Sequence, residues 1–261
     1  MIHKVKTENK KNGLSANMLK TIAIVAMLID HIGKKFVSQW DMPILYSIMS
    51  CIGYTTAAIM FFFLVEGYHK TRNINRYLVR LGLFAIISYV PYILFQSGTL
   101  PSLNNDSYNY LSLNVIFTLF IGAVMLHALH RIKNPLLKWS IVLSLFAIST
   151  FSDWSPIGLA YVLIFDYFYG DYKNQAFTYA ILILSGIFAV LQSPIFTLIG
   201  VPFDKDYFII SLSQIGKIIP IILLAFYNQE RGSGGAVAKW GFYVFYPVHL
   251  LALFCIQQIV M

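Results

Sequence analysis

The stretch that decides the fold is residues 20–31, Lys-Thr-Ile-Ala-Ile-Val-Ala-Met-Leu-Ile-Asp-His, in which a basic residue opens an apolar run. Eleven steps of about 100° make roughly three whole turns plus 20°, so Lys20 and His31 share one helix face, about 16 Å apart along the axis. Ionisable groups at membrane depth are costly, so Asp30 and His31 are by default a candidate functional site. The spacing suits a long ligand that is held by a charged end at Lys20 and reacts near His31.

The composition predicts a membrane protein. Of 261 residues, 58% are hydrophobic and only 11% are charged, whereas a soluble domain carries about 25% charged residues. The net charge of +8 comes from basic residues in short loops beside apolar runs. This distribution is typical of membrane topology and argues against a nucleic-acid partner.

Apolar segments of near-spanning length follow one another along most of the chain. They are residues 19–38, 47–67, 78–96, 111–129, 137–151, 155–170, 176–196, 207–227 and 240–260. A spanning helix needs about 20 apolar residues, so 137–151 and 155–170 are short and would be tilted, re-entrant or one incomplete hairpin. The sequence therefore predicts an all-α, polytopic transmembrane helix bundle of about nine spans, with ten as the alternative count. Residues 1–18 form a polar cytosolic arm, and 19–261 form a single transmembrane domain.

Loop charge predicts the orientation in the cell membrane. The arm and alternate loops carry Lys4, Lys6, Lys10, Lys11, Lys70, Arg72, Arg76, Arg80, Arg131, Lys133, Lys138, Lys173, Arg231 and Lys239. The other loops hold only Lys34, Lys35 and Lys205. The positive-inside rule therefore places the N-terminus in the cytosol and, with nine spans, the C-terminus outside. An even count would leave the C-terminus inside.

Several ionisable residues fall near the cytosolic face on this topology. Lys20 and Glu66 lie at one level, on neighbouring helices, and we expect them to form an ion pair. Arg72, Arg76 and Arg80 are spaced by four and form one stripe. Guanidinium groups bind phosphate oxygens bidentately, so the stripe suits a phosphate ligand. The alternative is contact with anionic membrane lipid headgroups.

A second group belongs to the outer half of the bundle, where His31 lies. Neighbours on a helix point about 100° apart, so Asp30 cannot orient the His31 ring directly. Another helix must supply the partner, and the candidates at that level are Asn114, Asp153 and His249.

Lys217 lies near the middle of the eighth segment, between Gly216 and Pro220. A cation at that depth needs a partner or a wet cavity. Asp30 and Asp166 are the candidate partners, and the sequence does not choose between them.

Several stretches resemble the TraX family, membrane proteins associated with N-terminal acetylation of conjugative pilin, and related transmembrane acyltransferases. They are residues 19–20, 27–33 (Met-Leu-Ile-Asp-His-Ile-Gly), 63–68 (Phe-Leu-Val-Glu-Gly-Tyr), 71–73, 76–81 (Arg-Tyr-Leu-Val-Arg-Leu), 84–88 with Pro91, 113–119 and 245–250 (Phe-Tyr-Pro-Val-His-Leu). In order and spacing they cover nearly the whole chain.

The resemblance implies a transferase that takes acetyl from cytosolic acetyl-CoA, without a metal, and delivers it near the outer face. The acceptor would be a pilin-like peptide N-terminus or an envelope glycan. In the wider acyltransferase group the reactive motif is a basic residue followed by a histidine, with ten residues between them. That motif implies binding of acetyl-CoA by Lys20 with Arg72, Arg76 and Arg80, and chemistry at His31 with Asp30. Glu66, Asn114, Lys217 and His249 complete the expected pocket.

The chemistry of histidine agrees with this role. Transfer to an amine or hydroxyl needs a base near neutral pH, and the ordinary pKa of histidine, about 6.5, meets that need. His31 is the expected general base for direct transfer, with a transient acetyl-histidine as the variant.

Two other functions stay open. One is a proton-coupled small-molecule transporter with Asp30, His31 and Lys217 as a relay, although the lack of internal repeats argues against it. The other is a non-catalytic membrane partner of a secretion or envelope complex.

Overall fold

The computed structural model describes residues 12–101, 111–154, 156–196 and 205–260. These residues form helices joined by turns and contain isolated β-bridges but no strand, which confirms the predicted all-α class. Five helical segments within them are long and apolar enough to cross a membrane: Ala16–Gln39, Pro43–Lys70, Ile74–Ser97, Phe208–Ala225 and Trp240–Val260. The predicted count of nine spans is not confirmed.

The helices follow the order of the predicted segments. They are α1 Ala16–Lys35, η1 Val37–Gln39, α2 Pro43–Lys70, α3 Ile74–Ile87, α4 Tyr89–Ser97, α5 Val115–Arg131, α6 Pro135–Ser149, α7 Ile157–Tyr167, α8 Tyr172–Phe196, α9 Lys205–Ser211, η4 Leu212–Ile218, α10 Ile219–Ala225 and α11 Gly235–Val260. The two segments expected to be short are α6 and α7, with 15 and 11 residues.

Proline and capping residues explain where several helices begin and break. Ser15 caps α1 by accepting a hydrogen bond from the amide of Met18. The third predicted segment is divided at Ser88 into α3 and α4. Pro91 has no amide hydrogen for the Ile87 carbonyl four residues earlier, so an unbroken helix there would lose that bond.

The residues before α1 are held by the segment between α10 and α11. The Leu14 amide donates to the Phe226 carbonyl, and the Ala16 amide donates to the Glu230 carbonyl, both at 2.8 Å. Residues 1–11 of the predicted arm lie outside the described residues. The start of α1 is therefore fixed beside the α10–α11 segment.

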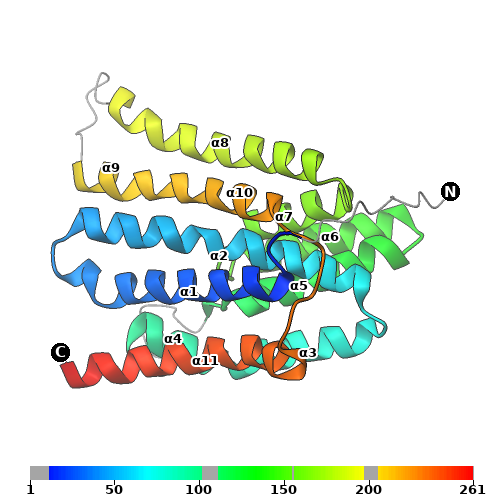
Figure 1. Ribbon diagram of the computed structural model, residues 1–261, viewed down its shortest axis with the longest axis horizontal. Helices are drawn as coiled ribbons and strands as arrows, with labels where there is room; N and C mark the ends of the chain where they lie inside the picture. The colour runs from blue at the N-terminus through cyan, green and yellow to red at the C-terminus, as the bar shows by residue number, and fades with distance from the viewer. Residues whose placement is uncertain (1–11, 102–110, 155, 197–204, 261) are drawn as a thin grey trace.

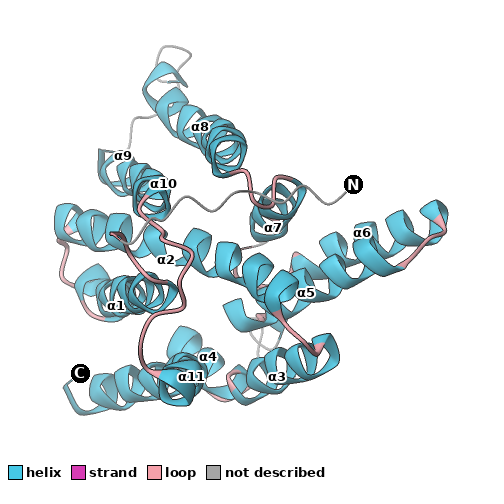
Figure 2. Ribbon diagram, turned by 45° about the vertical axis from the view of Figure 1, so that its right-hand side comes forward, coloured by secondary structure: helices cyan, strands magenta, loops and turns pink. Residues whose placement is uncertain are grey.

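Figure 1 shows the helices stacked in approximate layers, with α8 outermost, then α9 and α10, then α2, then α1, and finally α11 with α3 and α4. The helices α1 and α11 run in the same direction, and α2 runs in the opposite one. Figure 2 shows the same order from another direction, with α6 extending away from the bundle. Its Leu136 and Leu143 side chains are exposed.

Two glycines allow η4 and α1 to lie close to α2. A Cβ atom at Gly216 of η4 would lie 1.9 Å from the Cys51 carbonyl oxygen, so only glycine fits against α2 there. A Cβ atom at Gly53 would lie 2.3 Å from Cβ of Asp30 on α1. Gly53 thus makes the space that the Asp30 side chain occupies.

Candidate active site

One cavity of about 970 Å³ runs through the layers formed by α1, α2 and α11 and is also lined by α3, α5 and η4. Its volume is at the upper end of typical ligand pockets. The lining residues of α1 lie on one helix face, as single residues or adjacent pairs three or four positions apart: Ala16, Asn17, Lys20, Ile24, Met27, Asp30, His31 and Lys34. Lys20 and His31 therefore lie along the same cavity, in agreement with the face predicted from their spacing.

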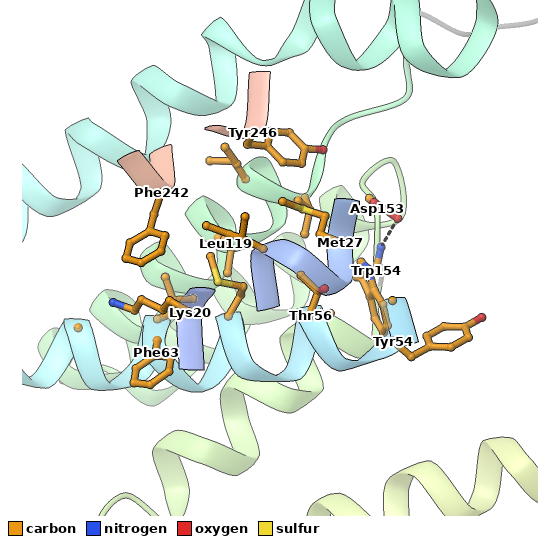
Figure 3. A pocket seen from close by; sticks show the side chains of 18 of the residues that line it. Lys20, Met27, Tyr54, Thr56, Phe63, Leu119, Asp153, Trp154, Phe242 and Tyr246 are labelled. Atoms are coloured by element: carbon orange, nitrogen blue, oxygen red, sulfur yellow. Dashed lines mark hydrogen bonds between the residues drawn. The ribbon is translucent and has the colours of Figure 1, made fainter. Parts of the chain in front are cut away.

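At the end nearest the start of α1 the cavity is cationic. The Nζ atom of Lys20 lies 4.9 Å from the centre of the Phe63 ring and 5.8 Å from that of Phe242. Figure 3 shows Lys20 between these two rings. Both distances are within the range of a cation–π contact, which holds the ammonium group at this end of the cavity.

The arginine stripe divides between the cavity and the surface. Arg72 and Arg80 line the cavity, whereas Arg76 is exposed and is not among the lining residues. The Arg80 guanidinium lies 5.3 Å from the centre of the Tyr77 ring and 5.2 Å from that of Tyr243. Its buried Nε atom has no hydrogen-bond partner in the part of the chain that the structure describes. The predicted stripe therefore offers two arginines to a ligand in the cavity.

Glu66 also lines this end, but the predicted Lys20–Glu66 ion pair is wrong. The Glu66 carboxylate pairs with Lys70, one turn further along α2, and accepts a hydrogen bond of 2.5 Å from the Tyr227 hydroxyl. No ion pair joins Lys20 to Glu66 in the part of the chain that the structure describes. Burial and the Glu66 carboxylate raise the pKa of Tyr227, which keeps this phenol a donor.

Sequence reasoning missed the contribution of the α10–α11 segment to this end. Tyr227 and Arg231 both line the cavity. From the sequence, Arg231 was considered only as one of the loop charges that predict the membrane orientation. Loops often carry ligand-binding residues, so the position of Tyr227 and Arg231 in a short loop is the feature that could have indicated them.

At the opposite end, His31 and His249 form a hydrogen bond between α1 and α11. The distance from His31 Nδ1 to His249 Nε2 is 2.7 Å. The Nδ1 atom of His249 lies 2.9 Å from the Phe245 carbonyl oxygen, which can only accept, so this Nδ1 carries a hydrogen. In a neutral His249 the Nε2 atom is then an acceptor, and His31 Nδ1 donates to it. The His31 Nε2 atom is left without a hydrogen, as a base requires.

Asp30 does not share this hydrogen bond. Its carboxylate forms an ion pair of 2.7 Å with Lys34, one turn further along α1, and packs against Gly53. The structure therefore agrees with the expectation that Asp30 cannot orient the His31 ring. Among the three candidate partners, the one that contacts His31 is His249.

Asp153 and Trp154, in the turn after α6, close the His31 end of the cavity beside Tyr54 (Figure 3). The Asp153 carboxylate accepts a hydrogen bond of 3.1 Å from the Trp154 amide. Burial raises the pKa of this carboxyl group, and the Lys34 charge opposes that effect. The His31 end of the cavity thus combines acidic, basic and aromatic groups.

Of the four predicted pocket residues, Glu66 lines the cavity, whereas Asn114, Lys217 and His249 are not among the lining residues. Asn114 caps α5 by accepting from the Phe117 amide at 3.1 Å, and it donates to the Ala85 carbonyl of α3 at 2.8 Å. Its role in the structure is to join α3 to α5.

Lys217 is stabilised by aromatic rings. Its Nζ atom lies 5.0 Å from the centre of the Tyr54 ring and 5.9 Å from that of Trp154. The predicted acidic partners pair elsewhere, Asp30 with Lys34 and Asp166 with His69 and His130. Lys217 therefore contacts Tyr54 and Trp154, two aromatic residues that line the cavity, without lining it itself.

Comparison with known proteins gives a family match and one similar protein. The family model described as "TraX protein" matches residues 15–257. The chain is 31% identical over 246 residues to the "Probable fimbrial assembly protein FimC, serogroup H1" of Dichelobacter nodosus, covering 92% of this chain and 94% of that protein. No solved structure matches the chain.

Proposed function

The chain belongs to the TraX family, and from this premise we propose that it is an integral-membrane acetyltransferase. It moves acetyl from cytosolic acetyl-CoA to an acceptor at the outer side of the membrane. The observation that carries the proposal is one cavity with cationic groups at one end and His31 at the other. The hydrogen bond from His31 Nδ1 to His249 leaves His31 Nε2 without a hydrogen, as a base requires. This arrangement suits a donor whose anionic phosphates and reactive thioester are separated by a long arm.

The donor phosphates lie at the cationic end in this proposal. Lys20, Arg72, Arg80 and Arg231 supply positive charge there. Arg80 is the strongest candidate because it lines the cavity and its buried Nε atom has no hydrogen-bond partner among the described residues. A charge-assisted hydrogen bond to a phosphate oxygen would satisfy it. The pantetheine arm then extends along α1 toward His31.

His31 acts as the general base at the other end. The acceptor nitrogen or oxygen forms a bond to the acetyl carbonyl carbon while the carbon–sulfur bond of the thioester breaks. The Nε2 atom of His31 takes the acceptor proton and passes it to the departing CoA thiolate, so charge and atoms balance. His249 holds the His31 ring in the tautomer that this step needs and stabilises the imidazolium that forms. A carboxylate plays the corresponding part in the serine protease triad.

The preferred acceptor is the N-terminal amine of a pilin-like peptide, with an envelope glycan as the alternative. The relative from Dichelobacter nodosus is described as a fimbrial assembly protein, which favours a fimbrial subunit. Asp30 and Asp153 line the His31 end and offer carboxylates near an incoming amine.

The orientation belongs to the same proposal. The cationic end faces the cytosol with the arm of residues 1–18, and residues 19–261 act as one transmembrane domain in the cell membrane. The basic residues Arg72, Arg80 and Arg231 at one end of the cavity support this sidedness.

Binding and product analysis together test the function. Isothermal titration of the purified protein with acetyl-CoA should give saturable binding, and desulfo or dephosphorylated analogues should separate the phosphate and thioester contributions. Mass spectrometry of envelope peptides from cells with the wild-type or His31→Ala protein should show an acetyl group that depends on His31. Binding without any His31-dependent acetylated product would leave only a nucleotide-binding membrane protein and contradict the proposal.

A further inference from the structure

A second group of ionisable side chains lies outside the cavity, where α2, α5 and α7 end. His69, His130 and Asp166 are each the residue before the last in their helices, Pro43–Lys70, Val115–Arg131 and Ile157–Tyr167. One potential ligand atom from each residue can be chosen so that the three atoms all lie within 4.8 Å of one another. Three potential metal ligands from three helices therefore meet at one point.

Both imidazole rings point their Nε2 atoms at the Asp166 carboxylate. His69 Nε2 lies 2.7 Å from Asp166 Oδ1, and His130 Nε2 lies 3.0 Å from each carboxylate oxygen. Two imidazole nitrogens and one carboxylate form a ligand set that borderline divalent metals prefer. A cation between them would replace these hydrogen bonds with coordination bonds after shifts of about 1 Å, given metal–ligand distances of about 2.0–2.2 Å.

The rings are already oriented by aromatic neighbours. Tyr169 stacks on His69 with the ring centres 3.9 Å apart, and Tyr68 stacks on His130 with the ring centres 5.6 Å apart. Stacking restricts rotation of each imidazole, so less ordering is needed when a ligand binds. The geometry is therefore held by contacts beyond the three polar residues themselves.

The position also favours a cation. The carboxyl end of a helix carries a partial negative charge within its last turn, and three such ends converge here. The ligand side chains are 25%, 41% and 11% exposed for His69, His130 and Asp166, so an ion can reach them from solvent. Lys70 and Arg131 follow two of the ligands, but Lys70 is engaged by Glu66.

We propose that His69, His130 and Asp166 form a binding site for a divalent transition metal of the zinc class, with water completing the coordination. In the metal-free protein each Nε2 carries a hydrogen, because the Asp166 carboxylate that it faces can only accept. On metal binding that hydrogen moves to Nδ1 by exchange with solvent, and the freed Nε2 lone pair coordinates the ion without oxidation or reduction. The site revises the expectation from sequence that the protein uses no metal. It is distinct from the acetyl-transfer cavity and does not depend on the proposed activity.

A bound metal would tie the ends of α2, α5 and α7 together. His69 is next to Lys70, which pairs with Glu66 in the cavity lining. Metal binding would therefore stabilise the wall of the cavity at its cationic end. We assign the site a structural role on this ground.

Zinc titration of the full-length protein tests the site. The protein is purified without a polyhistidine tag, stripped with a chelator and titrated with Zn²⁺ by calorimetry. We expect a single saturable equivalent and a higher melting temperature in the wild type. His69→Ala and His130→Ala should lose both effects, and Asp166→Asn, which keeps the side-chain shape, should weaken binding.

His127→Ala is the matched control, because His127 lies on α5 one turn before His130 and is not part of the ligand group. It should bind zinc like the wild type. Co²⁺ added to the stripped wild type should give a visible absorption spectrum that Zn²⁺ abolishes. The proposal is overturned if the wild type binds no saturable zinc, if binding survives in the folded His69→Ala and His130→Ala proteins, or if it is lost in His31→Ala instead.

Discussion

His31 Nδ1 and His249 Nε2 lie 2.7 Å apart and connect α1 to α11 across 218 positions of the sequence. The second ring nitrogen of His249 faces the Phe245 carbonyl at 2.9 Å, so the direction of both hydrogen bonds is determined by an acceptor that cannot donate. The contact gives His31 the ring tautomer of a general base.

His31→Ala should abolish acetyl transfer and leave acetyl-CoA binding nearly unchanged. The residue lies about 16 Å along α1 from Lys20, too far to contact phosphates held there. Loss of a positioned base typically lowers a rate about 10² to 10⁴-fold. Single-turnover transfer and calorimetric binding, measured on the same preparation, check the two halves of the prediction. Near-normal turnover in a correctly inserted variant would remove His31 from the mechanism.

His249 is a positioning residue, and two substitutions of similar length distinguish that role from simple packing. His249→Gln keeps an oxygen that can accept from His31 Nδ1, whereas His249→Met does not. We expect the methionine variant to lose about 10²-fold in kcat with little change in KM, and the glutamine variant to recover part of the loss. The pH–rate profile of the methionine variant should also shift. Equal losses in both variants, with unchanged profiles, would reduce His249 to a packing contact.

Arg80 and Arg76 provide a matched pair one turn apart on α3. Arg80 lines the cavity and has an unsatisfied Nε atom, whereas Arg76 is exposed and does not line it. Arg80→Gln should weaken acetyl-CoA binding about 10- to 100-fold, the equivalent of one hydrogen bond to a charged group, and most strongly at low salt. Arg76→Gln should bind like the wild type.

Because both arginines contribute to the positive-inside charge, a topology reporter must accompany the titrations. If the two substitutions weaken binding equally while the topology is correct, the stripe acts through general charge and not through a contact in the cavity.

Gly53→Ala should destabilise the protein and displace Asp30. The new methyl group would meet the Asp30 side chain at 2.3–2.7 Å, and overpacking of this kind costs about 1–3 kcal/mol. Gly241→Ala on α11 is the control, since within the described residues no atom outside its own stretch of helix backbone lies within 4 Å of its Cβ position. Alanine is favoured over glycine in a helix by about 1 kcal/mol, so the control should be neutral or stabilising. Thermal unfolding in detergent compares the two, and equal melting temperatures would contradict the close approach of α1 to α2.

The helical class and the face shared by Lys20 and His31 followed from the sequence, because hydrophobic content and the period of 3.6 residues are local properties. The spacing of Arg76 and Arg80 also predicted one stripe. Which of the two faces the cavity depends on the buried neighbours Tyr77 and Leu81, and therefore on how α3 packs. That information is tertiary and is not contained in the spacing.

Partner choice between helices was the least predictable part of the site. Glu66 was expected to pair with Lys20 on α1, but Lys70 on its own helix reaches it at the shorter i,i+4 spacing. Asn114, Asp153 and His249 were all candidate partners for His31, and the adjacency of α1 and α11 distinguishes His249 from the other two. The convergence of α2, α5 and α7 at His69, His130 and Asp166 has no linear motif at all.

We propose above all that one cavity carries acetyl from a donor at the cytosolic face to an acceptor at the opposite face. Sealed inverted membrane vesicles test this most directly. Radiolabelled acetyl-CoA is added outside, at the face that corresponds to the cytosol, and a synthetic pilin-like peptide with a free N-terminus is trapped in the lumen. The account predicts label on the luminal peptide with the wild-type protein and none with His31→Ala. Label that appears only when peptide and acetyl-CoA share the outer compartment would contradict transfer across the bilayer.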